Sequence, residues 1–403
     1  MECRNQKEKG LWQEELVLFD QVQFIYELAL AQLELTMLGV KFTLEDGLRE
    51  FRLVEAEDIP KAGRRLAYFA RIAGTPTVYS RIIGKNRTRS VNQYLTHWIY
   101  PYKGKFHPQM VRALCNIIGL NPGDTVLDPF VGSGTTALEA QLLGVHCIGI
   151  DVSPLSVLQT RVKTESVFVL PDILQWRERV ESLLPQRGKT GGLDLSFIPE
   201  ERVRNFYLMA QLVATSDHTR RRRDFPRAFL QNLQRMVGSV SDYAELVRDL
   251  PLELGRVDIR VGDARNLPLL DESVDGIITS PPYSIALDYV VNDAHAFREM
   301  GYDPLLLRES FIGVRGKGRE KIALYNEDLK QSIREMARVL KPGKQAVIVL
   351  GNATHMGGEI PTVTFFTDCA QTMGFRLCHN LKKIIFGLYN VMQRENILIF
   401  QKG

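Results

Sequence analysis

The sequence predicts an α/β fold in which helices cover both faces of a mostly parallel sheet. From Pro108 onward, short apolar segments with the composition of buried strands alternate with segments of helical periodicity. Residues 121–151 show this pattern most compactly, because a turn, a strand, a glycine-rich turn, a helix and a second strand follow one another there. A βαβ unit of this kind makes its two strands parallel and joins them by a right-handed crossover.

The α/β domain is expected to be interrupted once. Its expected strands lie at 125–128, 146–151, 257–261, 276–279, 346–350 and 396–400, and its expected helices at 110–120 and 135–143. Between them, residues 165–254 are mostly helical in character, carry many arginines and are broken by glycine and proline. We therefore expect one α/β domain, formed by 96–164 and 255–403, with a helical insertion at 165–254.

Residues 1–95 precede this domain and are expected to form an N-terminal accessory region. Residues 12–38 carry apolar side chains at helical spacing without proline, which predicts one long helix that ends at Gly39. Strand-like pieces and turn signals alternate after it, at 66–69, Gly74, Pro76 and 77–80.

The composition is that of an ordinary globular protein, with 45% hydrophobic and 24% charged residues. No run approaches the roughly 18 apolar residues that a membrane span needs, and the polar start lacks a signal-peptide core. The five cysteines are scattered without a CxxC pair, which favours reduced thiols in a cytoplasmic protein and no metal site. The net charge of +4 identifies no partner, but three basic clusters are compatible with a polyanion: 81–89, 220–227 and 315–319.

A glycine-rich turn at 128–136 is the first candidate site. Glycine at Gly132 and Gly134 allows a tight turn and a close approach of the backbone to a ligand, and the next helix offers free N–H groups. Asp151 ends the following strand, where a carboxylate can accept hydrogen bonds from two ribose hydroxyls. Asp263 follows the third strand and is positioned to accept an amino proton from adenine.

The same turn, from Gly132 to Ala137, also fits the dinucleotide fingerprint. Asp128 favours a different ligand, because a carboxylate directed at the glycines suits the sulfonium cation of S-adenosylmethionine and repels a pyrophosphate. The sequence therefore predicts S-adenosylmethionine as the cofactor.

The second candidate site is 279–284, directly after an apolar strand. The consecutive Pro281 and Pro282 cannot continue a central strand, so the chain turns at the carboxyl edge of the sheet. The Ser280 hydroxyl and the Pro281 carbonyl can accept hydrogen bonds from the two N–H groups of an aromatic amino group, which frees its lone pair, and Tyr283 can stack on the base. Together the two sites indicate methylation of the exocyclic amino nitrogen of a base. A cytosine-C5 mechanism needs a cysteine next to proline, and none of the five cysteines follows a proline.

These segments resemble the DNA amino-methyltransferases, which make N4-methylcytosine or N6-methyladenine. The resemblance covers about 96–164 and 255–403 and implies a Rossmann-like, S-adenosylmethionine-dependent methyltransferase fold. Further segments match the family in character and order, at 102–108, 151–155, 262–264, 339–343 and 394–402. The resemblance implies DNA as the partner, a restriction-modification setting with a partner restriction endonuclease, and a cytoplasmic, nucleoid-associated location. In duplex DNA the target base must first leave the helix.

The family's residue roles carry over by motif. The implied cofactor-binding residues are Phe106, His107, Asp128, Pro129, Phe130, Gly132, Ser133, Gly134, Thr135, Asp151, Asp263 and Ala264. The implied catalytic residues are Ser280, Pro281, Pro282 and Tyr283. Serine at the first position of this tetrapeptide is typical of cytosine-N4 enzymes and aspartate of adenine-N6 enzymes. Cytosine N4 is therefore the expected target, with adenine N6 as the alternative.

Target recognition has two candidate regions, the insertion first and the N-terminal region second. Five arginines of the insertion could grip phosphate or form a solvated loop: Arg220, Arg221, Arg222, Arg223 and Arg227. RNA is the alternative substrate, since 120–130 and 262–268 also resemble tRNA guanine-N2 methyltransferases, which attach an N-terminal RNA-binding region. Those enzymes usually carry aspartate where this chain has Ser280. A catalytically inactive nucleic-acid-binding module is a further alternative, against which the intact acids and tetrapeptide argue.

Overall fold

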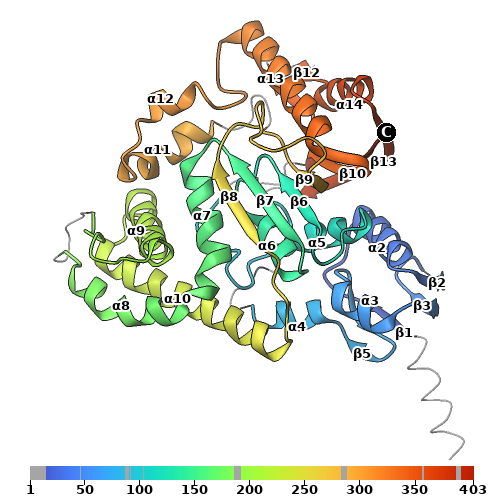
Figure 1. Ribbon diagram of the computed structural model, residues 1–403, viewed down its shortest axis with the longest axis horizontal. Helices are drawn as coiled ribbons and strands as arrows, with labels where there is room; N and C mark the ends of the chain where they lie inside the picture. Colours follow the sequence, from blue (N-terminus) through green and yellow to red (C-terminus); the bar gives the residue numbers. More distant parts are fainter. Residues whose placement is uncertain are drawn as a thin grey trace, which may run out of the picture.

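The computed structural model describes residues 15–45, 47–86, 90, 92–102, 104–185, 192–282, 288–355, 358–386 and 392–403. In these ranges the chain forms a seven-stranded sheet, a five-stranded sheet near the N-terminus and a group of long helices at one end (Figure 1). Within the same ranges, no helix has both the length and the apolar character that crossing a membrane would require.

The large sheet has the strand order β13-β14-β10-β9-β6-β7-β8. Its strands are β6 (Thr125–Asp128), β7 (His146–Asp151), β8 (Val257–Val261), β9 (Val274–Thr279), β10 (Leu340–Leu350), β13 (Phe375–Phe386) and β14 (Met392–Lys402). The strands from β10 to β8 in this order run parallel, whereas β14 is antiparallel to both β10 and β13. The expected α/β fold with a mostly parallel sheet is therefore confirmed.

Alternate residues of the strands pack on opposite faces of this sheet. On β10, Val347 and Val349 belong to one hydrophobic cluster, while Ile348 and Leu350 belong to another. The helices that contribute to these clusters are α5 (Pro108–Ile117) and α6 (Thr135–Leu142) for the first, and α13 (Gly318–Val339) and α14 (Thr362–Thr372) for the second. Because helices cover both faces, the central strands are nearly continuous apolar runs, which made them visible in the sequence.

The direction in which the chain moves through the sheet reverses between β6 and β9. From β6 the chain passes through α6 to β7 and through α7 (Pro154–Glu165) towards β8, and it returns to β9 on the other side of β6. Connections therefore leave the carboxyl ends of β6 and β9 in opposite directions. An open α/β sheet has a crevice at such a point, and ligands bind there.

Three helices separate α7 from β8. They are α8 (Leu170–Ser182), α9 (Glu201–Arg221) and α10 (Phe225–Asp249), with the short 3-10 helix η1 (Ser166–Phe168) before them. Their hydrophobic cluster includes Phe206 and Phe229, and also Phe297 of α11 (Tyr289–Glu299). Most of the described residues in 165–254 are helical, as expected, and the division of the chain into three regions stays a prediction.

An antiparallel sheet of order β2-β3-β1-β4-β5 lies in the N-terminal region. The elements there are β1 (Glu15–Leu18), α2 (Ile25–Met37), β2 (Val40–Leu44), β3 (Phe51–Ala56), α3 (Ile59–Arg65), β4 (Phe69–Ile72), β5 (Thr75–Pro76) and α4 (Val78–Gly84). Leu30 and Leu35 of α2 continue the hydrophobic cluster of α5. Buried Glu34 reinforces this contact, because its Oε1 accepts hydrogen bonds from Ala67 N at 2.9 Å and Asn116 Nδ2 at 2.6 Å. The N-terminal region thus packs directly on α5 of the α/β region.

The long helix expected over 12–38 is wrong in its first part. Residues 15–18 form β1, which pairs with β3 and β4, so contacts with distant segments override the local helical spacing. The helix begins only at Ile25, where the Glu27 carboxylate accepts hydrogen bonds from the backbone N–H groups before the helix. The expected end at Gly39 is confirmed, because Gly39 follows the helix with a φ of +68°.

The strand expected at 77–80 is also wrong. Thr77 caps α4 instead, since its hydroxyl accepts a hydrogen bond from Ser80 N at 3.2 Å. The sequence analysis missed β13, whose exposed charged residues conceal its pairing with β14 at the edge of the sheet. The remaining short elements are α12 (Pro304–Arg308), β11 (Ala353–His355) and β12 (Gly358–Ile360).

Candidate cofactor and catalytic site

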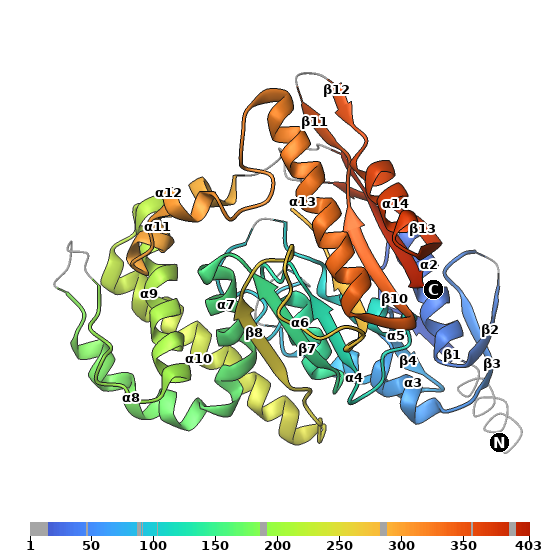
Figure 2. The ribbon, with the colours of Figure 1, turned by 45° about the horizontal axis from the view of Figure 1, so that its top comes forward.

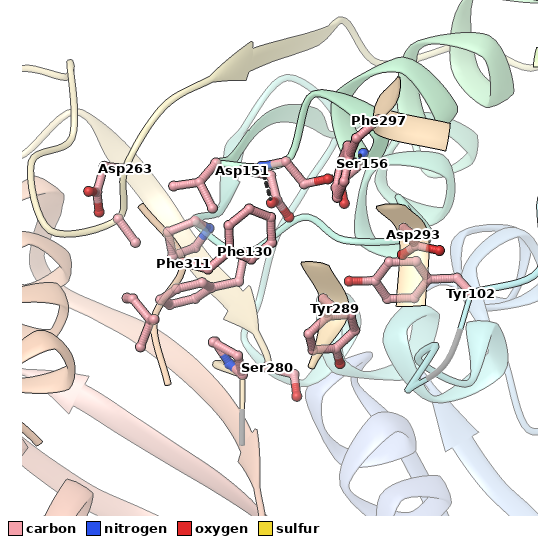
Figure 3. Close-up of a pocket in the computed structure, with 16 residues that line it drawn as sticks. Tyr102, Phe130, Asp151, Ser156, Asp263, Ser280, Tyr289, Asp293, Phe297 and Phe311 are labelled. Carbon is pink, nitrogen blue, oxygen red and sulfur yellow. Dashed lines mark hydrogen bonds between the residues drawn. The ribbon is translucent and has the colours of Figure 1, made fainter. Parts of the chain in front are cut away.

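Two adjoining cavities open at the carboxyl ends of β6 and β9, at the point where the direction of the chain reverses. The larger has a volume of about 650 Å³ and the smaller of about 490 Å³. They share Tyr102, Phe130, Ser280, Pro282 and Tyr289 in their walls. The glycine-rich turn and the proline corner, far apart in the sequence, therefore meet in one place, and Figure 3 shows the larger cavity.

Gly132 and Gly134 are each required in the turn, but for different structural reasons. Gly132 has a φ of +47° and donates its N–H to Asp151 Oδ2 at 2.9 Å. A Cβ atom at Gly132 would lie 2.9 Å from the Tyr102 hydroxyl. Gly134 has a φ of +76°, and a Cβ atom there would lie 2.6 Å from Thr160 Oγ1 on α7. Gly134 thus permits close packing of the turn on α7 and lines neither cavity.

Two side chains of α7 hold the back of this turn. Gln159 Nε2 donates to the Gly132 carbonyl at 2.8 Å, and Lys163 Nζ donates to the Ser133 carbonyl at 2.7 Å. Both side chains are fully buried, and burial lowers the pKa of the Lys163 ammonium well below its ordinary value. Because these carbonyls are held from the α7 side, the turn has its shape before any ligand binds.

Two carboxylates lie beside the turn, the buried Asp128 and the partly buried Asp151. Asp128 Oδ1 accepts hydrogen bonds from Thr279 Oγ1 at 2.6 Å and from Phe130 N at 3.2 Å. Asp151 accepts from Ser153 N at 2.9 Å in addition to Gly132 N. Burial raises the pKa of each carboxyl to about 6, because both charges are desolvated. A cationic ligand in the adjoining cavities would relieve this cost.

A third acid, Asp263, lies at the opposite end of the larger cavity from Tyr102 (Figure 3). The Arg265 guanidinium holds it with Nη2 at 2.6 Å and Nε at 2.9 Å from its oxygens. Phe130, Phe311 and Ile312 supply apolar wall surface to the same cavity. An apolar slot with an acceptor at its end suits a planar base that carries an amino group.

The proline corner, residues 279–282, lies at the carboxyl end of β9, as the sequence predicted. Thr279 ends β9 fully buried, and Ser280 follows in the walls of both cavities. Pro282 also lines both cavities, and Pro281 lines the smaller. Tyr283 lies outside the described residues, so its stacking role stays a prediction.

The other expected cofactor residues divide between the two cavities. The larger is lined by Pro129, Phe130, Asp151, Asp263 and Ala264, and the smaller by Phe106, Asp128, Phe130, Gly132, Ser133 and Thr135. His107 lines neither and instead borders a neighbouring groove with Tyr26 and Lys383.

Several wall residues were not found by sequence reasoning, namely Ser156, Tyr289, Asp293, Phe297, Phe311 and Ile312. Most lie on or after α11, which tertiary packing brings to the site. Tyr289 stacks on Tyr102 with ring centroids 5.7 Å apart and planes 21° from parallel. Tyr102 belongs to the segment 102–108 that resembles the family, and that was the only sequence signal for this aromatic pair.

The expected phosphate-binding arginines are mostly engaged within the protein. Arg221 and Arg223 both pair with Asp217, at 2.9 and 3.1 Å. Arg220 Nη2 donates to the Asn292 carbonyl at 2.7 Å. Arg222 is the left-handed residue that ends α9, and Arg227 borders a surface groove beside Arg223. Binding of nucleic acid by this cluster stays a prediction.

Comparisons with known proteins agree with this site. Residues 75–159 match the family model described as DNA methylase. A type II methyltransferase, M.BsoBI from Geobacillus stearothermophilus, is 51% identical over 65 residues, which cover 16% of this chain and 13% of that protein. M.MjaII from Methanocaldococcus jannaschii is 44% identical over 81 residues, which cover 20% and 14% respectively.

A tRNA (guanine(10)-N2)-dimethyltransferase from Methanothermobacter thermautotrophicus is 34% identical over 80 residues, which cover 20% of this chain and 23% of that protein. The chain thus matches less than a quarter of the length of each of these relatives. Among solved structures, TrmN from Thermus thermophilus aligns over 78% of this chain and 54% of its own, at 14% identity and a TM-score of 0.37.

The fold and the site fit a methyltransferase whose cofactor is S-adenosylmethionine. Within that class, residues 75–159 resemble the DNA methylases, and the aligned type II methyltransferases are similar to part of this chain. The residues present fit this cofactor, because the buried Asp128 suits its cation and the partly buried Asp151 suits its ribose. Gly132 lines the smaller cavity, and without a side chain its backbone can approach a ligand there closely.

Proposed function

We propose that this chain methylates the exocyclic amino group of a base in DNA, with N4 of cytosine as its target. One observation carries the proposal: Ser280, on the proline corner, lines both cavities beside the turn that holds Asp128 and Asp151. The aligned relatives named as type II methyltransferases support DNA as the substrate.

In this proposal the two cavities divide the cofactor between them. Asp151 would accept from the ribose hydroxyls, and Asp263 would accept the adenine amino group in the slot formed with Phe130 and Ile312. Asp128 and the Gly132 turn would hold the charged, methionine end in the smaller cavity. S-adenosylmethionine supplies an activated methyl group when it is bound there.

The chain's own residues prepare the amino nitrogen. Its lone pair is delocalised into the base, so the nitrogen becomes nucleophilic only when its geometry changes. The Ser280 hydroxyl and the Pro281 carbonyl accept hydrogen bonds from its two N–H groups and favour a more tetrahedral nitrogen with a directed lone pair. Catalysis then depends on positioning within a cavity that excludes water, and needs no strong base.

The target must leave the duplex to reach Ser280. Tyr283 is proposed to stack on the flipped base, and the Tyr102–Tyr289 pair adds aromatic surface to the same walls. We propose that the helical insertion, 165–254, contributes to target recognition and that a restriction endonuclease accompanies the enzyme in a restriction-modification system.

Methylation of RNA is the second candidate function. The relatives named as tRNA (guanine(10)-N2)-dimethyltransferases favour it, as does an N-terminal region that forms a sheet of its own. Ser280 favours DNA, because the tRNA enzymes usually carry aspartate at that position.

The Ser280→Ala variant tests the proposed catalytic role. We expect methyl transfer to fall roughly 100-fold or more, as for the loss of one preorganised hydrogen-bonding group, with the Kd for S-adenosylmethionine unchanged within about twofold. Ser273→Ala is the matched control, since Ser273 directly precedes β9 at the opposite edge of the sheet from Ser280 and lines neither cavity, so its methyl transfer should persist. Equal loss of cofactor affinity and activity in Ser280→Ala would contradict the assignment.

A further inference from the structure

Two adjacent leucines near the site lie largely in water. Leu305 and Leu306 of α12 are 76% and 75% exposed, and Val291 of α11 is 69% exposed. Full burial of a leucine side chain is worth roughly 1.5–3 kcal/mol, so a neighbouring pair left in water forgoes a substantial stabilisation. Exposed apolar groups gathered in this way mark surfaces that contact a partner.

The helices that carry these side chains form part of the cavity wall. Phe297 of α11 lines the larger cavity, as do Phe311 and Ile312, which follow α12 directly. Figure 1 and Figure 2 both show α11 and α12 side by side next to α9.

The topology places α12 at the edge of the sheet where the site opens. A helix that precedes a parallel strand runs antiparallel to it, so α13 begins at the carboxyl edge. The segment 304–317 leads into α13 and therefore lies at the same edge as Ser280. The exposed leucines are thus on the side of the molecule from which a target base would enter.

Positive charge follows the leucines in the sequence. Residues 315–321 contain Arg315, Lys317, Arg319 and Lys321 against a single acid, Glu320. Asp328 binds Arg315 at 2.5 Å, whereas Lys317 and Arg319 are exposed to water. Positive and negative charges are more evenly matched around α12 itself. Asp303 and Glu309 flank this helix, and Arg308 pairs with Asp288 at 2.7 Å. An apolar pair next to basic side chains is complementary to a nucleic-acid duplex.

We propose that Leu305 and Leu306 form a wedge that enters duplex DNA beside the target base, while Lys317 and Arg319 contact the flanking phosphates. Extrusion of a base costs a few kcal/mol of stacking and pairing, and apolar side chains inserted between base steps offset part of this cost. The inference rests on the proposed function, because only a substrate whose target base is paired needs a wedge.

The double variant Leu305→Ala/Leu306→Ala tests the wedge, and because both side chains are largely exposed the fold should survive. We expect methyl transfer to a duplex to fall roughly tenfold or more, with transfer to the same sequence as a single strand unchanged within about twofold. With 2-aminopurine at the target position of a duplex, the fluorescence increase on binding should shrink in the variant. Leu270→Ala is the matched control, since Leu270 is 81% exposed but precedes β9 at the opposite edge of the sheet.

The possible outcomes separate the wedge from the proposed function. A variant that methylates duplex and single strand as the wild type does would overturn the wedge, and so would equal losses on both substrates. If sedimentation shows that the variant dissociates a dimer while duplex methylation persists, the leucines bind a second copy of the chain, which also overturns it. Failure of the proposed function would appear in the wild type itself, as an absence of methyl transfer to either form of DNA.

Discussion

Asp128 allows the cofactor assignment to be tested through stability as well as binding. Its carboxylate is 2% exposed and accepts hydrogen bonds from the Thr279 hydroxyl and the Phe130 N–H. The Asp128→Asn substitution keeps an oxygen acceptor for both bonds but removes the buried negative charge. We therefore expect the variant to fold more stably than the wild type and to bind S-adenosylmethionine more weakly.

The size of the expected stability difference follows from the pKa of the Asp128 carboxyl. Burial raises the pKa of Asp128 from 3.8 to about 6. At 1.36 kcal/mol per pKa unit, the ionised carboxylate costs the folded state about 3 kcal/mol. Because the folded pKa lies above the unfolded one, this cost is fully present above the folded pKa, and it disappears as the pH falls below the unfolded pKa. The stability gain of the variant should therefore be largest at neutral and alkaline pH and vanish near pH 4.

Denaturant titrations of both proteins without cofactor, at about pH 8 and about pH 5, measure this difference in the free energy of unfolding. Calorimetric titration at the higher pH measures the Kd for S-adenosylmethionine. We expect this Kd to be at least roughly tenfold higher in the variant than in the wild type. Equal stability of the two proteins at every pH would refute the buried-charge argument. Unchanged cofactor affinity would refute the placement of the sulfonium beside Asp128.

Two further predictions concern the glycine-rich turn. Lys163→Met removes the donor that holds the Ser133 carbonyl. The Kd for S-adenosylmethionine in calorimetric titration should therefore rise by roughly tenfold. An unchanged Kd would mean that Lys163 does not shape the turn. Gly134→Ala places a Cβ atom 2.6 Å from Thr160 Oγ1 at a φ of +76°, so unfolding experiments should show a loss of roughly 1–3 kcal/mol. A stability equal to the wild type would contradict the packing of Gly134 on α7.

Three strands of the large sheet could be predicted from the sequence with the bounds that the structure has. β6, β7 and β8 were expected at 125–128, 146–151 and 257–261, as observed. These strands lie in the parallel part of the sheet, and apolar runs between turn signals reveal such strands locally. By contrast, β1 depends on antiparallel pairing with the distant strands β3 and β4, and the exposed charged residues of β13 conceal its pairing with β14.

The residues of the candidate site also fall into two groups, those that local motifs reveal and those that only tertiary packing brings to the site. The turn around Gly132 and the corner at Ser280 are short local motifs, so the sequence alone indicates them. Tyr289 and Phe311 reach the cavities only because α11 and the segment after α12 pack beside the sheet. The arginines 220–223 show the converse, since their spacing suggests a phosphate site but folding pairs two of them with Asp217.

The central claim is most directly tested by methyl transfer from labelled S-adenosylmethionine to unmethylated DNA and, in parallel, to unmodified tRNA and rRNA. Nucleoside mass spectrometry of the products then identifies the methylated base. The account predicts N4-methyldeoxycytidine, with unlabelled RNA. N6-methyldeoxyadenosine would keep the family and overturn the target base, whereas a methylated ribonucleoside with unlabelled DNA would contradict the account.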